Sequence, residues 1–274
     1  MPEGPEIRRA ADRVAAAIAG RVASWVWFGL PELERWGPVL SGRRVERVDT
    51  RGKAMLTRFE GGLVVYSHNQ LYGRWYVRKA GSEPKTNRQL RFAVHTAERS
   101  ALLYSASEID VLGEEALDAH PFLAKLGPDL LDEGTDERVV RARLRDGRFR
   151  RRQLGALYLD QGFLAGLGNY LRAEILFRAR CHPRERPADL EAKRVRKLAA
   201  ETLAVTRRAY VSGGVTLDPR RAEALKKQGA SRRARRFWVY GRAARPCRLC
   251  ATPIERLDVG GRHTFLCPHC QPAP

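Results

Sequence analysis

Apolar residues recur at helical spacing near the start of the chain and predict an amphipathic helix over residues 5–19. The residues on its apolar face are Ile7, Ala10, Ala11, Val14 and Ile18. Gly20 ends the pattern, because glycine commonly terminates helices. Glu3 and Glu6 lie at the helix start, where free N–H groups and the helix dipole favour carboxylates. These two carboxylates therefore have a structural explanation, which is compatible with a chemical role as well.

The pattern over residues 22–105 changes to short β-rich runs separated by Gly or Asn turns. The predicted strands are residues 45–48, 55–59, 63–67, 75–77, 91–96 and 101–105. So many short strands indicate either a β-sandwich or a β-barrel.

Pro121 and Gly127-Pro128 mark a boundary, after which helical periodicity returns. We expect helices over residues 136–144, 153–164, 169–178 and 189–209. Residues 212–235 are rich in Gly, Arg and Lys and predict a loop, followed by a short ribbon from Phe237 to the end. The chain thus divides into a β-rich domain (1–120), a linker (121–135), a helical domain (136–228) and a cysteine-bearing domain (229–274). The fold class is α+β and multidomain.

Charge separates this chain from an ordinary globular protein. Among 274 residues there are 51 Lys and Arg against 31 Asp and Glu, a net charge of +20. Such an excess points to a polyanionic partner, most simply nucleic acid. No apolar run is long enough to span a membrane, and acidic residues stand where a signal peptide would be basic. We therefore expect a cytoplasmic protein.

Four cysteines near the C-terminus have the spacing of a zinc site. Cys247 and Cys250 form one CxxC pair, and Cys267 and Cys270 form another after sixteen intervening residues. Four thiolates at this spacing bind Zn²⁺ tetrahedrally and leave no open position for water, so the metal is expected to be structural. The alternative, a redox pair, does not explain the duplication. Cys181 stands apart and is interpreted as an ordinary cysteine.

Pro2 is the first candidate for covalent chemistry. If Met1 is removed, Pro2 carries a free secondary amine, and N-terminal amines have a pKa of about 8. A useful fraction is then neutral at cellular pH and can attack an electrophilic carbon to form an iminium ion. The alternative is that a proline simply precedes a helix, which is common.

Three further segments carry candidate residues. The helical pattern breaks at Gly166 and Gly168 and restarts at Asn169, a good N-cap, which would make a seat for a phosphate. Residues 68–73 place Leu71 and Tyr72 at a turn, where they could fill a gap in a base stack or simply pack on their own sheet. Lys53 follows a Gly turn and is of interest only if the fold brings it towards Pro2.

Taken together, these residues resemble the bacterial Fpg/Nei superfamily of DNA glycosylases. The resemblance rests on Met-Pro-Glu-Gly-Pro-Glu at the start, Arg-Gly-Lys at 51–53, Gly-Leu-Gly-Asn at 166–169 and the four-cysteine finger. It covers the whole chain in order. The stretches 67–73 and 103–107 favour the endonuclease VIII branch, since the purine-directed branch usually has a methionine in the loop at 68–73.

The resemblance implies a two-layer β-sandwich with a flanking helix, a helix–two-turn–helix domain and a zinc finger, with DNA bound in a cleft. It implies excision of oxidised pyrimidines in base excision repair, with AP lyase cleavage by β,δ-elimination. The partner would be double-stranded DNA with damaged bases or abasic sites, bound by a monomer that uses one structural Zn²⁺ and no catalytic metal.

The resemblance also assigns roles to individual residues. Pro2 would be the nucleophile, Glu3 the general acid/base and Glu6 a supporting carboxylate. Lys53 and Arg262 would bind phosphate and assist the eliminations. The DNA-binding residues would be Gln70, Leu71, Tyr72, Lys125 and Asn169. Lys125 departs from the arginine common at its position, and the basic stretch 211–236 belongs to a loop that varies between branches.

Two alternatives stay open at this point. One is an oxidised-purine (formamidopyrimidine or 8-oxoguanine) glycosylase of the same superfamily. The other is a zinc-containing nucleic-acid-binding protein without catalytic activity, which would explain the charge and the finger but not the joint match of Pro2, Glu3, Lys53 and Asn169.

Overall fold

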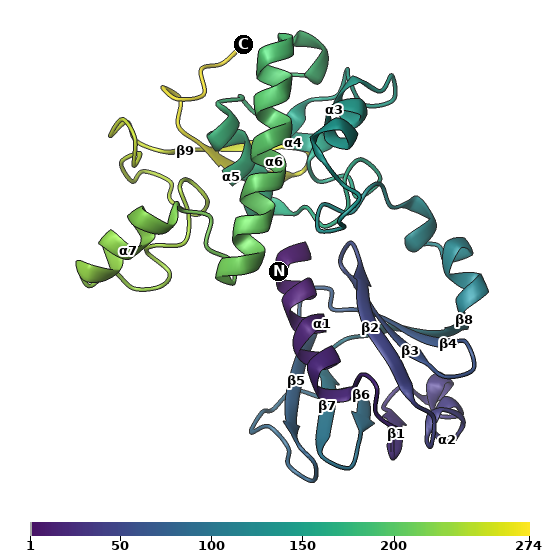
Figure 1. Cartoon of the computed structure of the whole chain (residues 1–274). Coiled ribbons are helices and arrows are strands. Elements are labelled where there is room, and N and C mark those ends of the chain that lie inside the picture. The colour runs from purple at the N-terminus through teal and green to yellow at the C-terminus, as the bar shows by residue number, and fades with distance from the viewer. Residues whose placement is uncertain (1) are drawn as a thin grey trace. The chain divides into compact units, whose positions relative to one another are not determined.

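Two units with separate cores make up residues 2–274, which the computed structural model describes. The first unit ends at Lys125, and the second comprises Leu126–Pro274 (Figure 1). Met1, whose removal would free the Pro2 amine, lies outside the described residues.

The first unit contains one long helix and two four-stranded antiparallel sheets (Figure 1). One sheet has the strand order β1-β6-β7-β5 and the other β2-β3-β4-β8. The strands are β1 (Trp25–Phe28), β2 (Val45–Arg51), β3 (Ala54–Phe59), β4 (Leu63–His68), β5 (Arg74–Lys79), β6 (Leu90–His95), β7 (Arg99–Tyr104) and β8 (Glu108–Gly113). The helices are α1 (Gly4–Ile18), α2 (Trp36–Leu40) and the 3-10 turns η1 (Pro31–Leu33), η2 (Glu114–Ala119) and η3 (Leu123–Lys125).

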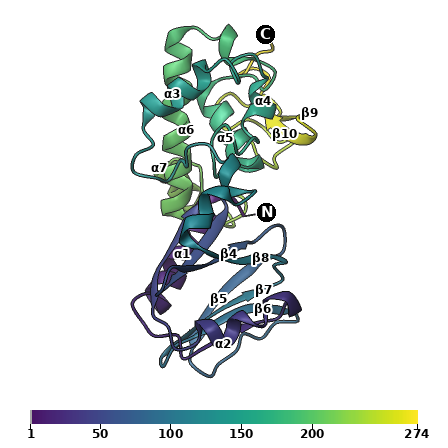
Figure 2. The same cartoon turned by 90° about the vertical axis from the view of Figure 1, so that its right-hand side faces the viewer.

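The main apolar core of this unit lies between the two sheets and α1. Val14 and Ile18 from α1 share this core with Phe59 of one sheet and Phe28 and Phe92 of the other. Figure 2 shows the sheets as two layers. The structure therefore decides between sandwich and barrel and confirms the two-layer β-sandwich with a flanking helix.

The second unit is mainly helical and ends in a β-hairpin. Its elements are α3 (Glu137–Arg145), α4 (Leu154–Leu157), α5 (Asn169–Ala179), η4 (Pro187–Asp189), α6 (Ala192–Ser212), α7 (Pro219–Lys227), β9 (Glu255–Val259) and β10 (Arg262–Leu266). Tyr158, Phe163 and Leu171 lie in the helical core. A second cluster joins Phe177 of α5 to Trp238 and to Cys267, so the four-cysteine finger packs directly on the helices.

The predicted helix over residues 153–164 is wrong beyond its first turn. Only α4 forms, and the chain then turns repeatedly before α5 begins. The Asp160 carboxylate accepts from the Gly162 amide at 2.8 Å, and the Gln161 side chain donates to the Leu167 carbonyl at 2.9 Å. Such side-chain bonds to the backbone compete with the helix ladder, which explains the error.

The predicted loop over residues 212–235 is also partly wrong, because α7 occupies Pro219–Lys227. Proline at the start of a helix is favourable, since its missing N–H has no partner to lose there. Ala222 is the only buried residue of α7, so almost no apolar face was available to reveal the helix.

Strands β1 and β8 were not among the predicted runs. In β8, the charged residues Glu108 and Asp110 interrupt the apolar pattern by which a strand is recognised. Their carboxylates bind the side chains of Tyr66 and His120 in the same unit. Among the described helices of both units, none is long and apolar enough to cross a membrane.

Candidate active site

The N-terminal residues are held in place by the start of α1. Glu3 is the N-cap of this helix, and its side chain and that of Glu6 form a reciprocal capping box. The Glu3 backbone N–H donates to Glu6 Oε2 at 3.1 Å. Glu3 is only 3% exposed. The capping explanation for both carboxylates is thus real, and it fixes them next to Pro2.

A pocket of about 460 Å³ opens beside Pro2 in the first unit. Pro2 and Glu6 line one part of it, and Asn69, Gly73 and Trp75 line another. The pocket therefore brings Pro2 and a carboxylate next to the turn between β4 and β5. If Met1 is removed, a group that entered the pocket would meet a secondary amine and a carboxylate together.

The turn between β4 and β5 presents two large side chains to solvent. Leu71 is 54% exposed and Tyr72 is 66% exposed, so their own sheet does not bury them. Gln70 has a φ of 48°, in the left-handed region. Gly73 closes the turn, and a β-carbon there would lie 2.5 Å from the Asn69 carbonyl oxygen. The backbone geometry thus makes residues 70–72 protrude.

Lys53 follows Gly52 in the turn between β2 and β3, where Gly52 has a φ of 62°. Ala54 pairs with His68, so this turn lies beside the end of β4. Burial lowers the pKa of His68, the Glu108 carboxylate opposes that effect, and the Lys53 charge lowers the pKa further. His68 is therefore neutral at neutral pH, and Lys53 lies close enough to influence it.

In the second unit, a buried arginine brings Asn169 and Arg262 together. Arg172 is fully buried on α5 and donates to Asn169 Oδ1 at 2.5 Å and to the Arg262 carbonyl at 3.3 Å. The Asn169 amide also donates to the His263 carbonyl at 3.0 Å. Asn169 is the first residue of α5 and Gly168 is its cap, so the expected N-cap role of Asn169 is wrong. Its side chain binds Arg172 and the His263 carbonyl of the hairpin instead.

Arg262 is exposed at the start of β10, next to the turn formed by Gly260 and Gly261. A β-carbon on Gly260 would lie 3.0 Å from Cα of Ala156, so the turn packs closely against α4. The hairpin is therefore held by Arg172 of α5 and by its packing against α4. The exposed side chain of Arg262 is available to bind an anion.

The four C-terminal cysteines form a site that fits a tetrahedral metal. Their Sγ atoms all lie within 4.8 Å of one another, and those of Cys250 and Cys267 are 3.4 Å apart. Sulfur atoms bound to one Zn²⁺ are separated by roughly 3.8 Å, and a disulfide would need about 2 Å. Zn²⁺ therefore suits this cluster. By contrast, burial raises the pKa of Cys181 to about 11, consistent with an ordinary cysteine.

The predicted site residues fall into two groups. In the first unit, Pro2 and Glu6 line one pocket with Asn69 and Gly73 of the turn, and Glu3 caps the helix beside them. Lys125 is exposed at the last position of this unit. Asn169 and Arg262 lie together in the second unit. Sequence reasoning missed Arg172 and Glu108. One feature of the sequence could have pointed to Arg172, namely a charged residue within the apolar helix that follows Asn169. No sequence pattern pointed to Glu108.

Family models match most of the chain. The formamidopyrimidine-DNA glycosylase N-terminal domain matches residues 1–107, and the H2TH domain of the same proteins matches residues 126–220. A zinc finger found in FPG and IleRS matches residues 245–273. The chain belongs to the Fpg/Nei family of DNA glycosylases.

Within this family, the chain is similar to proteins named Endonuclease 8. It is 46% identical to that of Escherichia coli strain UMN026 over 99% of this chain and 100% of the relative. It is 44% identical to that of Pectobacterium atrosepticum over the same shares.

Solved structures share the fold at lower identity. A Lactococcus lactis Fpg bound to DNA with an oxidised pyrimidine superposes with a TM-score of 0.80 at 20% identity, covering 99% of this chain and 100% of that one. The same protein in complex with abasic-site DNA gives the same values.

Proposed function

We propose that this protein is a bifunctional DNA glycosylase and AP lyase of base excision repair that excises oxidised pyrimidines. The observation that carries the proposal is the pocket that joins Pro2 and Glu6 to the turn 69–73, with Glu3 fixed beside it. The similarity to Endonuclease 8 over the whole length supports the same activity and favours pyrimidine lesions. The absence of a methionine from residues 68–73 agrees with that branch.

In the glycosylase step, the lone pair of the Pro2 nitrogen forms a bond to C1′ of the damaged nucleotide. The bond from C1′ to the base breaks, the base leaves with that electron pair, and the proton that the Pro2 nitrogen loses on forming its new bond goes to the departing base. The sugar ring then opens as the bond from C1′ to O4′ breaks and Glu3 gives a proton to O4′. The product is an iminium ion between Pro2 and C1′, and Glu6 stabilises its positive charge.

In the lyase steps, the iminium acidifies the proton on C2′, whose removal expels the 3′ phosphate. A second elimination expels the 5′ phosphate, and water releases the sugar fragment from Pro2. Lys53 and Arg262 neutralise the phosphates, which would otherwise be repelled by Glu3 and Glu6. The strand is thereby cut on both sides of the abasic sugar.

The remaining residues hold the DNA. Leu71 and Tyr72 fill the gap left when the damaged nucleotide leaves the stack, because a base inside a duplex is out of reach of Pro2. Gln70 accompanies them, Asn169 and Lys125 bind phosphate, and the net charge of +20 strengthens binding to any DNA. We propose that the protein acts as a monomer on chromosomal DNA in the cytoplasm.

The metal has a structural role in this proposal. Zn²⁺ held by Cys247, Cys250, Cys267 and Cys270 keeps the finger folded, and four thiolates leave no position for a substrate. The covalent steps run through an amine and carboxylates, so no catalytic metal is proposed.

Borohydride trapping tests the proposal. The protein is incubated with duplexes that contain thymine glycol or 8-oxoguanine, the iminium is reduced, and the cross-linked peptide is sequenced by mass spectrometry. We expect an adduct on Pro2, faster trapping with thymine glycol, and loss of trapping and strand cleavage by at least about 10²-fold in Pro2→Gly.

Each other outcome has a definite meaning. An adduct with 8-oxoguanine DNA alone would place the protein in the purine branch. Unchanged strand cleavage by Pro2→Gly would refute the nucleophile, and no adduct with either duplex, from protein that starts at Pro2, would leave a DNA-binding protein without the chemistry.

A further inference from the structure

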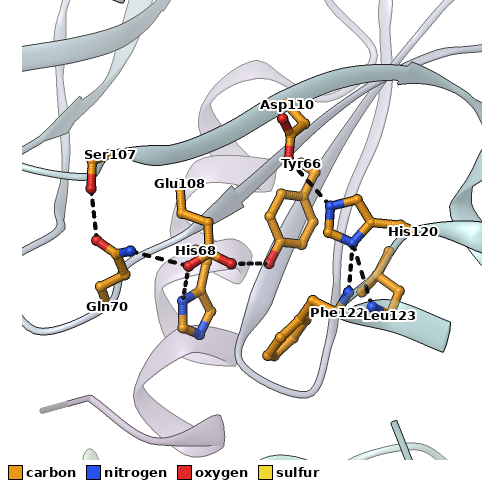
Figure 3. A network of polar contacts seen from close by, with 9 residues as sticks. All are labelled: Tyr66, His68, Gln70, Ser107, Glu108, Asp110, His120, Phe122 and Leu123. Carbon is orange, nitrogen blue, oxygen red and sulfur yellow. Dashed lines mark hydrogen bonds and ion pairs between the residues drawn. The ribbon is translucent and has the colours of Figure 1, made fainter. Parts of the chain in front are cut away.

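Both ends of the Gln70 amide are held by two consecutive residues at the start of β8 (Figure 3). Ser107 Oγ donates to Gln70 Oε1 at 2.9 Å, and Gln70 Nε2 donates to Glu108 Oε2 at 3.2 Å. Gln70 itself is exposed at the protruding turn, with its backbone in the left-handed region. A non-glycine residue keeps that conformation only where its surroundings fix it, and these two bonds supply such a constraint.

Glu108 is the centre of this network. Tyr66 donates its hydroxyl to Glu108 Oε1 at 3.0 Å, and His68 Nδ1 lies 3.1 Å from Glu108 Oε2. Burial raises the pKa of Tyr66, and Glu108 raises it further, so the phenol keeps its proton. Burial lowers the pKa of His68, which favours the neutral ring. Since a carboxylate only accepts, the Nδ1 that faces it carries the N–H of that ring. All three neighbours of Glu108 therefore donate.

These contacts fix the orientation of the Gln70 side-chain amide. An ionised carboxylate only accepts hydrogen bonds, so the amino group of Gln70 must face Glu108 and its carbonyl must face Ser107. The amide retains a second N–H and a second lone pair. Since the side chain is exposed, these unused groups face outwards in a fixed donor–acceptor order.

We infer that Glu108 is a positioning residue that sets the amide polarity of Gln70 and thereby the preference for the base opposite the lesion. The inference rests on the proposed function, in which duplex DNA meets residues 70–72. A base edge offers donors and acceptors in a base-specific order, and a well-placed amide discriminates between bases by roughly 5- to 100-fold. An amide free to turn over would present both orders and would lose that discrimination.

The test compares Glu108→Gln with wild type on duplexes that contain one lesion opposite A, C, G or T. Glutamine keeps the shape of Glu108 but both donates and accepts, so it no longer dictates the orientation of Gln70. We expect the ratio of kcat/KM between the best and worst opposite bases to fall by at least about fivefold. Ser107→Ala removes the other tether and should reduce the ratio in the same direction.

Two controls distinguish a role of Glu108 in orienting Gln70 from a general effect of Glu108 on activity. Asp110→Asn removes a carboxylate two residues along β8 that contacts His120 and not Gln70, so the ratio should stay at its wild-type value. Glu108→Gln made in a Gln70→Ala background should cause no further change in the ratio, because the side chain that Glu108 orients is already absent. Thermal melts establish that each variant folds.

The inference is overturned if Glu108→Gln and Ser107→Ala both keep the wild-type order and ratio, or lower all four rates equally. It is also overturned if wild type does not discriminate between opposite bases. A wild-type protein that cleaves none of the duplexes would refute the proposed function and this inference together, whereas the preceding outcomes leave the proposed function standing.

Discussion

His182 shows how one buried side chain links pH to stability. It is 6% exposed, and its Nδ1 accepts from the Arg184 amide at 3.2 Å. Burial lowers the pKa of His182, and the Arg184 charge lowers it further, while Glu185 and Glu255 oppose this. The folded state therefore favours the neutral ring, which is the form that can accept the Arg184 bond.

The consequence is a loss of stability in weak acid. The unfolded histidine has a pKa of about 6.5, so between that pH and the lower folded pKa the unfolded state binds more protons. Stability then falls as pH falls, by at most about 1.4 kcal/mol per pH unit for one group. We expect His182→Asn, which retains an acceptor but does not titrate, to flatten the dependence of Tm on pH between pH 6.5 and 5. An unchanged slope would mean that other groups dominate.

At the scale of elements, the exposed side chains of the turn between β4 and β5 can be mutated without disturbing the core. Its exposed Leu71 contributes little to the core, so truncation should leave stability within about 0.5 kcal/mol. If Leu71 fills a gap in the stack, Leu71→Ala should lower excision from duplex DNA by about tenfold or more and affect single-stranded lesions less.

A matched control for that variant lies in the same unit. Val39 on α2 is 41% exposed and does not line the pocket, and Val39→Ala removes exposed apolar surface without changing the turn. Rates on duplex and single-stranded lesions would be measured for both variants. Equal losses on the two substrates for Leu71→Ala would argue against the gap-filling role.

At the scale of the whole molecule, the separate cores of the two units predict independent responses to metal removal. The finger shares its apolar cluster with α5 of the second unit, whereas the first unit has its own core. Structural Zn²⁺ contributes on the order of 10 kcal/mol to the folding of small fingers. We therefore expect a chelator to lower the unfolding temperature of the second unit and to leave that of the first unchanged in calorimetry.

Cysteine variants check the ligand set in the same experiment. Cys250→Ala should abolish stoichiometric zinc, measured by atomic emission, and reproduce the effect of the chelator. Cys181→Ala should keep one zinc per chain, because Cys181 lies outside the cluster. Zinc retained by Cys250→Ala would mean that the ligand set differs from the four cysteines.

Sequence by itself determined the features that depend on local spacing. The helix at the N-terminus, most strands and the paired CxxC motifs follow from periodicity and ligand spacing, and neighbouring residues are enough to specify them. The prediction failed over residues 153–164 and 212–235, where side-chain bonds from Asp160 and Gln161 end a helix and where a helix has almost no apolar face.

Only the tertiary structure decided which distant side chains meet. The pocket joins Pro2 to Gly73, Arg172 ties Asn169 to Arg262, and Glu108 on β8 binds Gln70 in the turn between β4 and β5. These pairs are far apart along the chain, and a polar residue such as Glu108 leaves no periodic signal of what it contacts. Their contacts arise because burying the shared cores fixes the strands and helices in one register, which no local pattern specifies.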